Sequence, residues 1–155
     1  MIVSSLGNTE LLKLHKTAFL CSREISASVV LKCYDWAIEQ REKGSCVISG
    51  FHSKIEKDVF YYLLAGKQPV IMALARGMKE KIELEIQKEA DAGRLLIVTP
   101  FEKEVKRVTA ETALVRNRFM IELADEVMIG YASKGGMLEK LVSEIEGKKI
   151  FRMVD

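Results

Sequence analysis

An Arg-Asn-Arg triplet, Arg116, Asn117 and Arg118, is the part of this sequence best suited to binding chemistry. It lies in a stretch with helical spacing, and a short apolar strand at 126–130 follows it. Guanidinium and amide groups can hold a phosphate by charge-assisted hydrogen bonds. Residues two apart on a helix point in different directions, so one of the two arginines could be an ordinary surface residue.

Small residues, hydroxyls and cations also follow the predicted strands, where carboxylates are scarce. Such groups bind phosphate through backbone amides at helix N-termini, through hydroxyls and through Arg or Lys. In an open parallel sheet, ligands bind beyond the carboxyl ends of the strands, near the point where the strand order reverses. The candidate phosphate- or nucleic-acid-binding residues are therefore Ser22, Arg23, Ser49, Gly50, Ser53, Lys54, Arg116, Asn117, Arg118, Lys134, Gly135 and Gly136.

Several candidates also have a purely structural interpretation. The pair at 135–136 is typical of a turn, and Ser53 with Glu56 fits a capping box at a helix start. His52 is interpreted as a loop histidine, and the charged stretch 79–89 as a solvated helix face. Nothing after the first strand resembles Gly-x-Gly-x-x-Gly, so the sequence predicts no nicotinamide or flavin cofactor.

The elements that must position these residues alternate between strands and helices. Strands are expected at 17–22, 45–49, 69–74, 94–99, 126–130 and 149–153, and helices at 26–43, 53–65, 79–92, 109–124 and 137–146. Residues 1–15 are expected to be a lead-in segment whose leucines pack on the core. This alternation predicts an α/β fold: a Rossmann-like, open, mostly parallel sheet with helices on both faces, in a single domain over residues 1–155.

The composition limits the classes of function. A chain of 155 residues with a net charge of +2 can bury one full core, and any site for a polyanion must be a local patch. Cys21, Cys33 and Cys46 lack Cys-x-x-Cys spacing and are interpreted as reduced thiols of a cytoplasmic protein. No metal site is predicted, because neither histidine lies at zinc-ligand spacing from them. The sequence also predicts no signal peptide and no membrane partner.

The order of these motifs resembles the Rossmann-type domain of the DNA-processing protein A (DprA/Smf) family. Residues 21–23 (Cys-Ser-Arg) match a first strand ending in Gly-Ser-Arg, and residues 49–56 match Ser-Gly-x-x-x-Gly-Ile-Asp. The most specific match is 116–120 (Arg-Asn-Arg-Phe-Met) with Asp125, against Arg-Asn-Arg-Ile-Ile and an Asp before a strand. Residues 134–138 approximate the closing Lys-Ser-Gly-Ser-Leu pattern.

The resemblance implies single-stranded DNA binding in a basic pocket at the carboxyl edge of the sheet, without chemical turnover. It also implies a homodimer and the loading of a recombinase during natural transformation. The departures are Ser53, where the family commonly has an arginine, and Lys54, where it has a glycine. Phe51 is the only aromatic candidate near the site for stacking on a base.

The wider superfamily contains a second class of function. Lysine-decarboxylase-like (LOG) phosphoribohydrolases carry an arginine on the equivalent helix and a loop ending in Gly-Thr-x-x-Glu. By resemblance, Arg116 or Arg118 with Glu139 could supply these groups for N-glycosidic hydrolysis of a nucleotide, although Met137 replaces the Thr. A domain that senses a free nucleotide and catalyses nothing is the third alternative.

Overall fold

Short apolar runs without helical spacing form the central strands of one seven-stranded sheet in the computed structural model, which describes residues 1–154. The strands are β1 (Ser4–Gly7), β2 (Lys16–Cys21), β3 (Cys46–Ser49), β4 (Val70–Ala73), β5 (Leu95–Thr99), β6 (Glu126–Tyr131) and β7 (Lys149–Arg152). Every residue of β2, β3 and β5 is buried. Continuous burial of this kind is typical of parallel strands that are covered on both faces.

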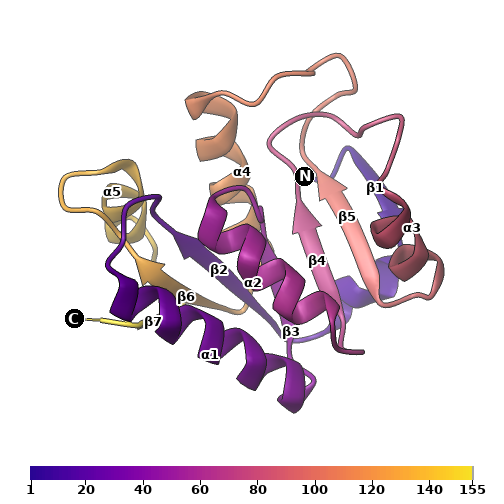
Figure 1. Cartoon of the computed structure of the whole chain (residues 1–155). Helices are drawn as coiled ribbons and strands as arrows, with labels where there is room; N and C mark the ends of the chain where they lie inside the picture. Colours follow the sequence, from indigo (N-terminus) through magenta and orange to yellow (C-terminus); the bar gives the residue numbers. More distant parts are fainter. Residues whose placement is uncertain (155) are drawn as a thin grey trace.

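The strand order is β1-β5-β4-β3-β2-β6-β7, and only the β1–β5 pair is antiparallel. The chain runs outward from β2 to β5 and then returns to place β6 on the other side of β2. The strand order therefore reverses between β2 and β6. The arrowheads of β4 and β5 point to the top of Figure 1, so the carboxyl edge of the sheet lies there.

Helices cover both faces of the sheet. On one face lie α1 (Ala27–Lys43), α2 (Lys54–Leu64) and α3 (Leu84–Asp91); on the other lie α4 (Ala110–Leu123), α5 (Met137–Ser143) and the 3₁₀ helix η1 (Thr9–Lys13). The sheet therefore has a hydrophobic core on each face. Within β5, Leu95 and Ile97 pack in the core under α1, α2 and α3, and Leu96 and Val98 pack in the core under α4, α5 and η1. The predicted α/β architecture is confirmed. No helix of the described residues combines the length and the apolar character needed to cross a bilayer.

Local capping determines where several helices begin and end. In the predicted capping box, Ser53 Oγ accepts a hydrogen bond from the Glu56 amide (3.3 Å), and the Glu56 carboxylate accepts one from the Ser53 amide (3.2 Å). Thr109 caps α4 in the same way, and α1 ends at Gly44 in the left-handed conformation. The predicted helix ends at these three positions are confirmed. They were predictable because each one depends on residues only three or four positions apart.

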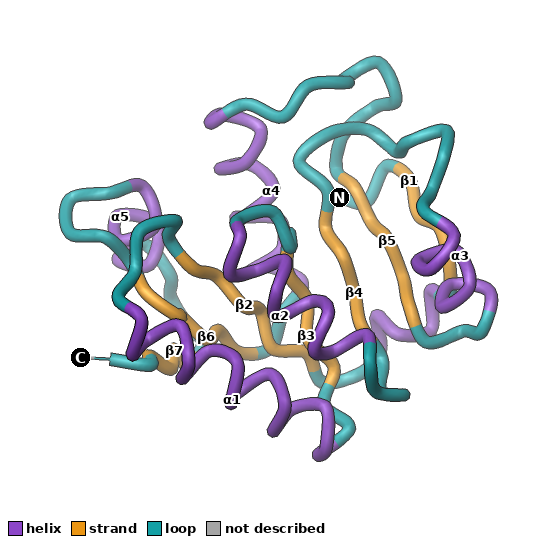
Figure 2. The backbone as a smooth tube through the Cα atoms, in the orientation of Figure 1, coloured by secondary structure: helices purple, strands orange, loops and turns teal. Residues whose placement is uncertain are grey.

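The expected lead-in over residues 1–15 instead contains β1, which pairs with β5 about 90 residues further along the chain. A four-residue strand is too short to show a recognisable alternation of apolar and polar residues, so it cannot be identified without its partner strand. The predicted helix over 79–92 begins only at Leu84, and the one over 137–146 ends at Ser143. A charged segment such as 79–83 has little apolar surface to pack on the sheet, so helical spacing alone does not make it helical. Figure 2 shows long loops after β4 and β5 at the carboxyl edge.

Candidate functional site

A cavity of about 430 Å³ lies where the strand order reverses, at the carboxyl ends of β2 and β6. We call it the switch-point cavity. Loops after β2, β3 and β6 and the helix α4 contribute its walls. It brings together six of the twelve predicted residues, namely Ser22, Arg23, Ser53, Arg116, Asn117 and Gly136. The position agrees with the rule that open α/β sheets bind ligands at the reversal point.

Ser22 joins the two loops that border this reversal point. Its hydroxyl accepts a hydrogen bond from the Ser133 amide (3.0 Å), and its own amide donates to the Tyr131 carbonyl (2.8 Å). Gly136 is the N-cap residue of α5 and lines the cavity beside Ser133. The loops after β2 and β6 are therefore held in a defined arrangement around the crevice.

Arg116 crosses from α4 to the carboxyl ends of the central strands and is only 5% exposed. Its Nη1 donates to the Ala73 carbonyl (3.2 Å), and its Nε donates to Asn117 Oδ1 (2.8 Å). Among residues 1–154 it forms no ion pair with a carboxylate. Burial lowers the pKa of the guanidinium, while the negative charge of Glu56 acts in the opposite direction. A buried cation without a paired anion is unfavourable unless a ligand supplies the charge.

Gly50 makes room for this guanidinium. A Cβ at position 50 would lie 2.1 Å from Arg116 Nη1, so a larger residue would displace the arginine. The neighbouring Ser49 is fully buried; its hydroxyl donates to the Phe19 carbonyl (2.8 Å) and accepts from the Phe51 amide (3.3 Å). Neither residue lines the switch-point cavity. Both shape the turn after β3, and Gly50 lines the cavity that adjoins it.

A buried carboxylate, Glu56, lies at the same edge. It accepts hydrogen bonds from the amides of Cys21 (3.2 Å), His52 (3.0 Å) and Ser53 (3.2 Å). These bonds tie the loop after β2 to the start of α2. The sequence indicates Glu56 as half of a capping box and as the acidic residue that ends the match over 49–56, but its contact with Cys21 depends on the tertiary structure.

Two predicted cations point away from the cavity. Arg118 Nη2 pairs with Glu144, the C-cap residue that follows α5 (3.1 Å), and Lys54 Nζ pairs with Asp58 one turn along α2 (2.9 Å). Neither is among the residues that line the switch-point cavity. Of the two arginines in the triplet, the structure therefore brings only Arg116 into the site.

The loop between β6 and α5 carries the remaining predicted residues. Lys134 and Gly135 are exposed there, and the Gly135 amide donates to Glu139 Oε1 (3.1 Å). This bond ties Glu139 to its own loop, and Glu139 does not line the cavity that contains Arg116. Arg116 and Glu139, one pair that the hydrolase alternative requires, therefore do not line the same cavity.

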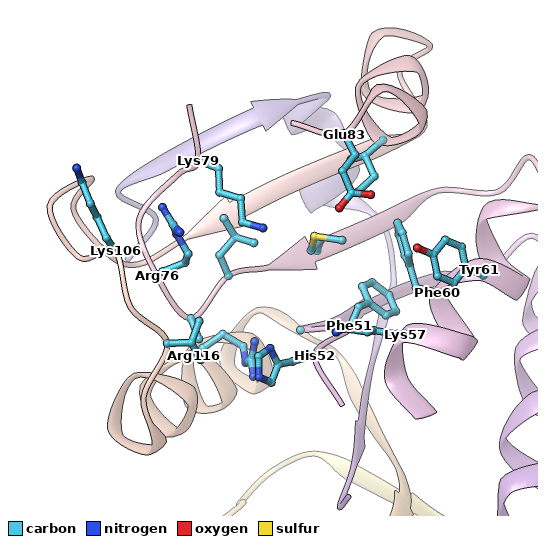
Figure 3. Close-up of a pocket in the computed structure, with 16 residues that line it drawn as sticks. Phe51, His52, Lys57, Phe60, Tyr61, Arg76, Lys79, Glu83, Lys106 and Arg116 are labelled. Carbon is cyan, nitrogen blue, oxygen red and sulfur yellow. The ribbon is translucent and has the colours of Figure 1, made fainter. Parts of the chain in front are cut away.

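A second cavity of about 400 Å³ adjoins the first one, between α2 and the loops after β4 and β5. We call it the β4 cavity, and Figure 3 shows its lining. His52 and Arg116 line both cavities. Partial burial and the charge of Arg116 lower the pKa of His52, which favours its neutral form.

The cations of the β4 cavity are Lys57, Arg76, Lys79 and Lys106. The sequence indicates only Arg76 as a candidate, because it follows the predicted strand over 69–74, and it does not assign the three lysines to a site. The charge pattern predicts Lys79 on a solvated helix face, but this lysine lies in the loop before α3. No local pattern distinguishes a loop lysine that faces a cavity from one that faces bulk water.

The fold and the site define a Rossmann-like domain with a basic crevice at the reversal point of its sheet. The model of the family described as DNA recombination-mediator protein A matches residues 1–152, so the chain belongs to this family. The resemblance inferred from the Arg-Asn-Arg block is thereby confirmed.

Two solved structures of DNA processing protein A are similar to this chain. The Helicobacter pylori protein, whose structure is described in terms of its single-stranded DNA binding mode, is 25% identical with a TM-score of 0.64; the match covers 81% of this chain and 58% of that one. The Streptococcus pneumoniae protein is 20% identical with a TM-score of 0.73, over 96% of this chain and 53% of that one. The chain thus spans little more than half the length of either protein. No curated protein sequence matches it.

Proposed function

We propose that this chain binds single-stranded DNA at the switch-point cavity and serves DNA processing or recombination. The observation that carries the proposal is the state of Arg116, a buried guanidinium beside the crevice with no carboxylate partner in the described chain. Its Nη2 also donates no hydrogen bond within residues 1–154. A phosphate in the cavity would supply both the charge and the acceptor.

The other residues of the cavity have roles that follow from their positions. Arg23 is exposed at the cavity wall, where it can pair with a phosphate. Asn117 orients Arg116 through the bond to its Nε. Ser22 and Gly136 allow the backbone to approach the ligand closely, and the exposed Lys134 is placed for a strand that continues past β6. None of these roles requires a chemical step.

Family membership and the single-stranded DNA binding described for the H. pylori protein favour a strand over a free nucleotide as the ligand. The family description as a recombination mediator supports a recombinase as the partner. A homodimer and a cytoplasmic location complete the proposal. The three cysteines are free and buried, in agreement with a reducing compartment.

Fluorescence anisotropy of a labelled single-stranded oligonucleotide tests the ligand. The logarithm of the binding constant should fall linearly with the logarithm of salt concentration, by about 0.7 for each phosphate neutralised. Arg23→Ala should flatten that slope by about 0.7. Arg118→Ala is the matched control, because this arginine pairs with Glu144 outside the cavity, and it should keep the slope of the unmodified chain.

One outcome would overturn the proposal. If no oligonucleotide binds, but AMP or ADP-ribose raises the Tm of the protein, the ligand is a nucleotide rather than a strand. The sensor alternative would then explain the cavity better than strand binding does.

A further inference from the structure

The switch-point cavity and the β4 cavity share one wall. Arg116 and His52 line both of them, and the two volumes, about 430 and 400 Å³, are similar. A ligand whose phosphate is held at Arg116 can therefore extend from one cavity into the other. A single phosphate would leave the second cavity unused.

The β4 cavity has an aromatic side (Figure 3). Phe51 packs on Phe60 with ring centroids 4.7 Å apart, and Phe60 lies 5.7 Å from Tyr61. The two phenylalanines are buried and form the floor, whereas Tyr61 is 53% exposed. Phe51 adopts a left-handed backbone conformation (φ 48°), which is unusual for an aromatic residue, and its packing against Phe60 holds the ring in place.

The opposite side of the same cavity is cationic. Arg76 and Lys79 come from the loop after β4, and Lys106 comes from the loop after β5. In Figure 3 the three cations lie on the side opposite the rings, and the Lys79 side chain points toward the rings. Lys79 and Lys106 form no ion pair in the part of the chain that the structure describes. Glu83 is the one carboxylate in the lining. Aromatic faces bind bases and lysines bind phosphates, so the cavity suits one nucleotide of a strand.

We propose that the β4 cavity binds the base of the nucleotide next to the phosphate held at Arg116. The base packs against Tyr61 and the phenylalanine floor, and its onward phosphate lies at Lys79 and Lys106. This inference rests on the proposed function. It makes the smallest ligand that fills both cavities a dinucleotide, and it makes recognition tolerant of sequence, because every base has a π-face.

Three leucine variants test the stacking surface. Tyr61→Leu should weaken binding of an unmodified oligonucleotide about fivefold, at the low end for a base–aromatic stack because leucine keeps some apolar contact. The salt slope should not change, since no phosphate contact is lost. Phe60→Leu should act in the same direction. Phe151→Leu, which changes an exposed aromatic residue on the edge strand β7, is the control and should have no effect.

A strand with abasic positions provides a second measurement on the same proteins. For the unmodified chain, removing the base should lower the binding affinity about as much as Tyr61→Leu does. For the Tyr61→Leu variant, removing the base should lower the affinity little further, because both changes remove the same contact. Melting temperatures well above the assay temperature would show that the variants remain folded, although Phe60→Leu should melt lower because Phe60 is buried.

The outcomes separate the two proposals. If Tyr61→Leu and Phe60→Leu bind like the unmodified chain while Arg23→Ala binds more weakly, the β4 cavity does not hold a base and strand binding at the switch-point cavity stands. If the unmodified chain binds no oligonucleotide, both proposals are wrong.

Discussion

Two largely buried arginines at opposite edges of the sheet have very different surroundings. At the amino edge, the Arg94 guanidinium donates to the carbonyls of Leu63 (2.9 Å), Leu64 (3.0 Å) and Gln68 (2.9 Å). It also pairs with Glu89 at 3.1 Å. Its charge and its donors are thus satisfied within the protein, and Arg94 connects the end of α2 and the start of β4 to α3.

At the carboxyl edge, Arg116 makes one bond to a carbonyl and one to Asn117, and no carboxylate pairs with it in the described chain. Lys16, a buried cation at the amino edge, again has partners: the carbonyls of Leu12 (2.8 Å) and Leu14 (2.7 Å). The difference shows that burial alone does not mean that a cationic residue has only a structural role. Arg116 keeps the capacity to bind an anion, which supports the ligand site proposed above.

The largest effect on folding is expected at the amino edge. Arg94→Ala should lower the free energy of unfolding by about 3 kcal/mol, because it leaves Glu89 and three carbonyls without their partner. Affinity for an oligonucleotide, measured on the folded fraction, should not change. Urea unfolding measures the free energy of unfolding, and fluorescence anisotropy of a labelled oligonucleotide measures the affinity. A loss of affinity in folded Arg94→Ala would remove the distinction between the two edges.

Arg116→Met makes the corresponding change at the carboxyl edge while it keeps most of the side-chain length. Affinity for single-stranded DNA should fall by about 10- to 100-fold, the range for losing a hydrogen bond to a charged group. The free energy of unfolding should stay the same or rise, because a buried, unpaired charge is removed. Marked destabilisation with unchanged affinity would instead make Arg116 a structural residue like Arg94.

Gly50→Ala tests the arginine indirectly and should have a smaller effect. The added Cβ would lie 2.1 Å from Arg116 Nη1, and the end of a flexible side chain can move aside, so the fold should tolerate it. The guanidinium would leave its position, and affinity should fall by about five- to tenfold. The double variant with Arg116→Met should bind no more weakly than Arg116→Met alone, since both changes act on one contact. Additive losses would show that Gly50 contacts the ligand by itself.

The smallest effect concerns Asp125, which lies before β6 at the amino edge. The Lys16 amide donates to its Oδ2 (2.8 Å), and this bond, with the Lys16 ammonium at 3.6 Å, holds the pKa of the carboxyl below its usual range. Its stabilising effect should therefore be complete above about pH 4 and be lost as the pH falls through the lowered pKa. Asp125→Asn should cost about 0.5 kcal/mol at pH 7, since the side chain is 47% exposed, and less at pH 3. A difference that does not depend on pH would show that the charge plays no part.

Short-range patterns made much of the fold predictable. The capping box at Ser53 and Glu56 and the glycine stop at Gly44 involve residues close in sequence, and both are confirmed. The edge strand β1 was missed, because its partner β5 lies far along the chain. The prediction of a helix over residues 79–83 was wrong, because helical charge spacing does not reveal whether the segment has a surface to pack on.

The residues that line the switch-point cavity were predicted in outline and not in detail. The sequence indicated phosphate chemistry at strand ends, but it could not decide between Arg116 and Arg118. In the structure, Glu144 pairs with one of them and Gly50 leaves room for the other. The aromatic side of the β4 cavity was also missed beyond Phe51, because nothing local shows that Phe60 and Tyr61 on α2 line the same cavity.

By itself, the sequence of this protein determined the alternation of strands and helices, most of the helix caps and the family to which the chain belongs. These depend on residue types and on spacings of a few positions. Only the tertiary structure decided which cations are already paired, which glycine makes room for a guanidinium, and that two cavities share Arg116. Those properties depend on which distant segments lie side by side, because a charge is free only if nothing else in the folded chain reaches it.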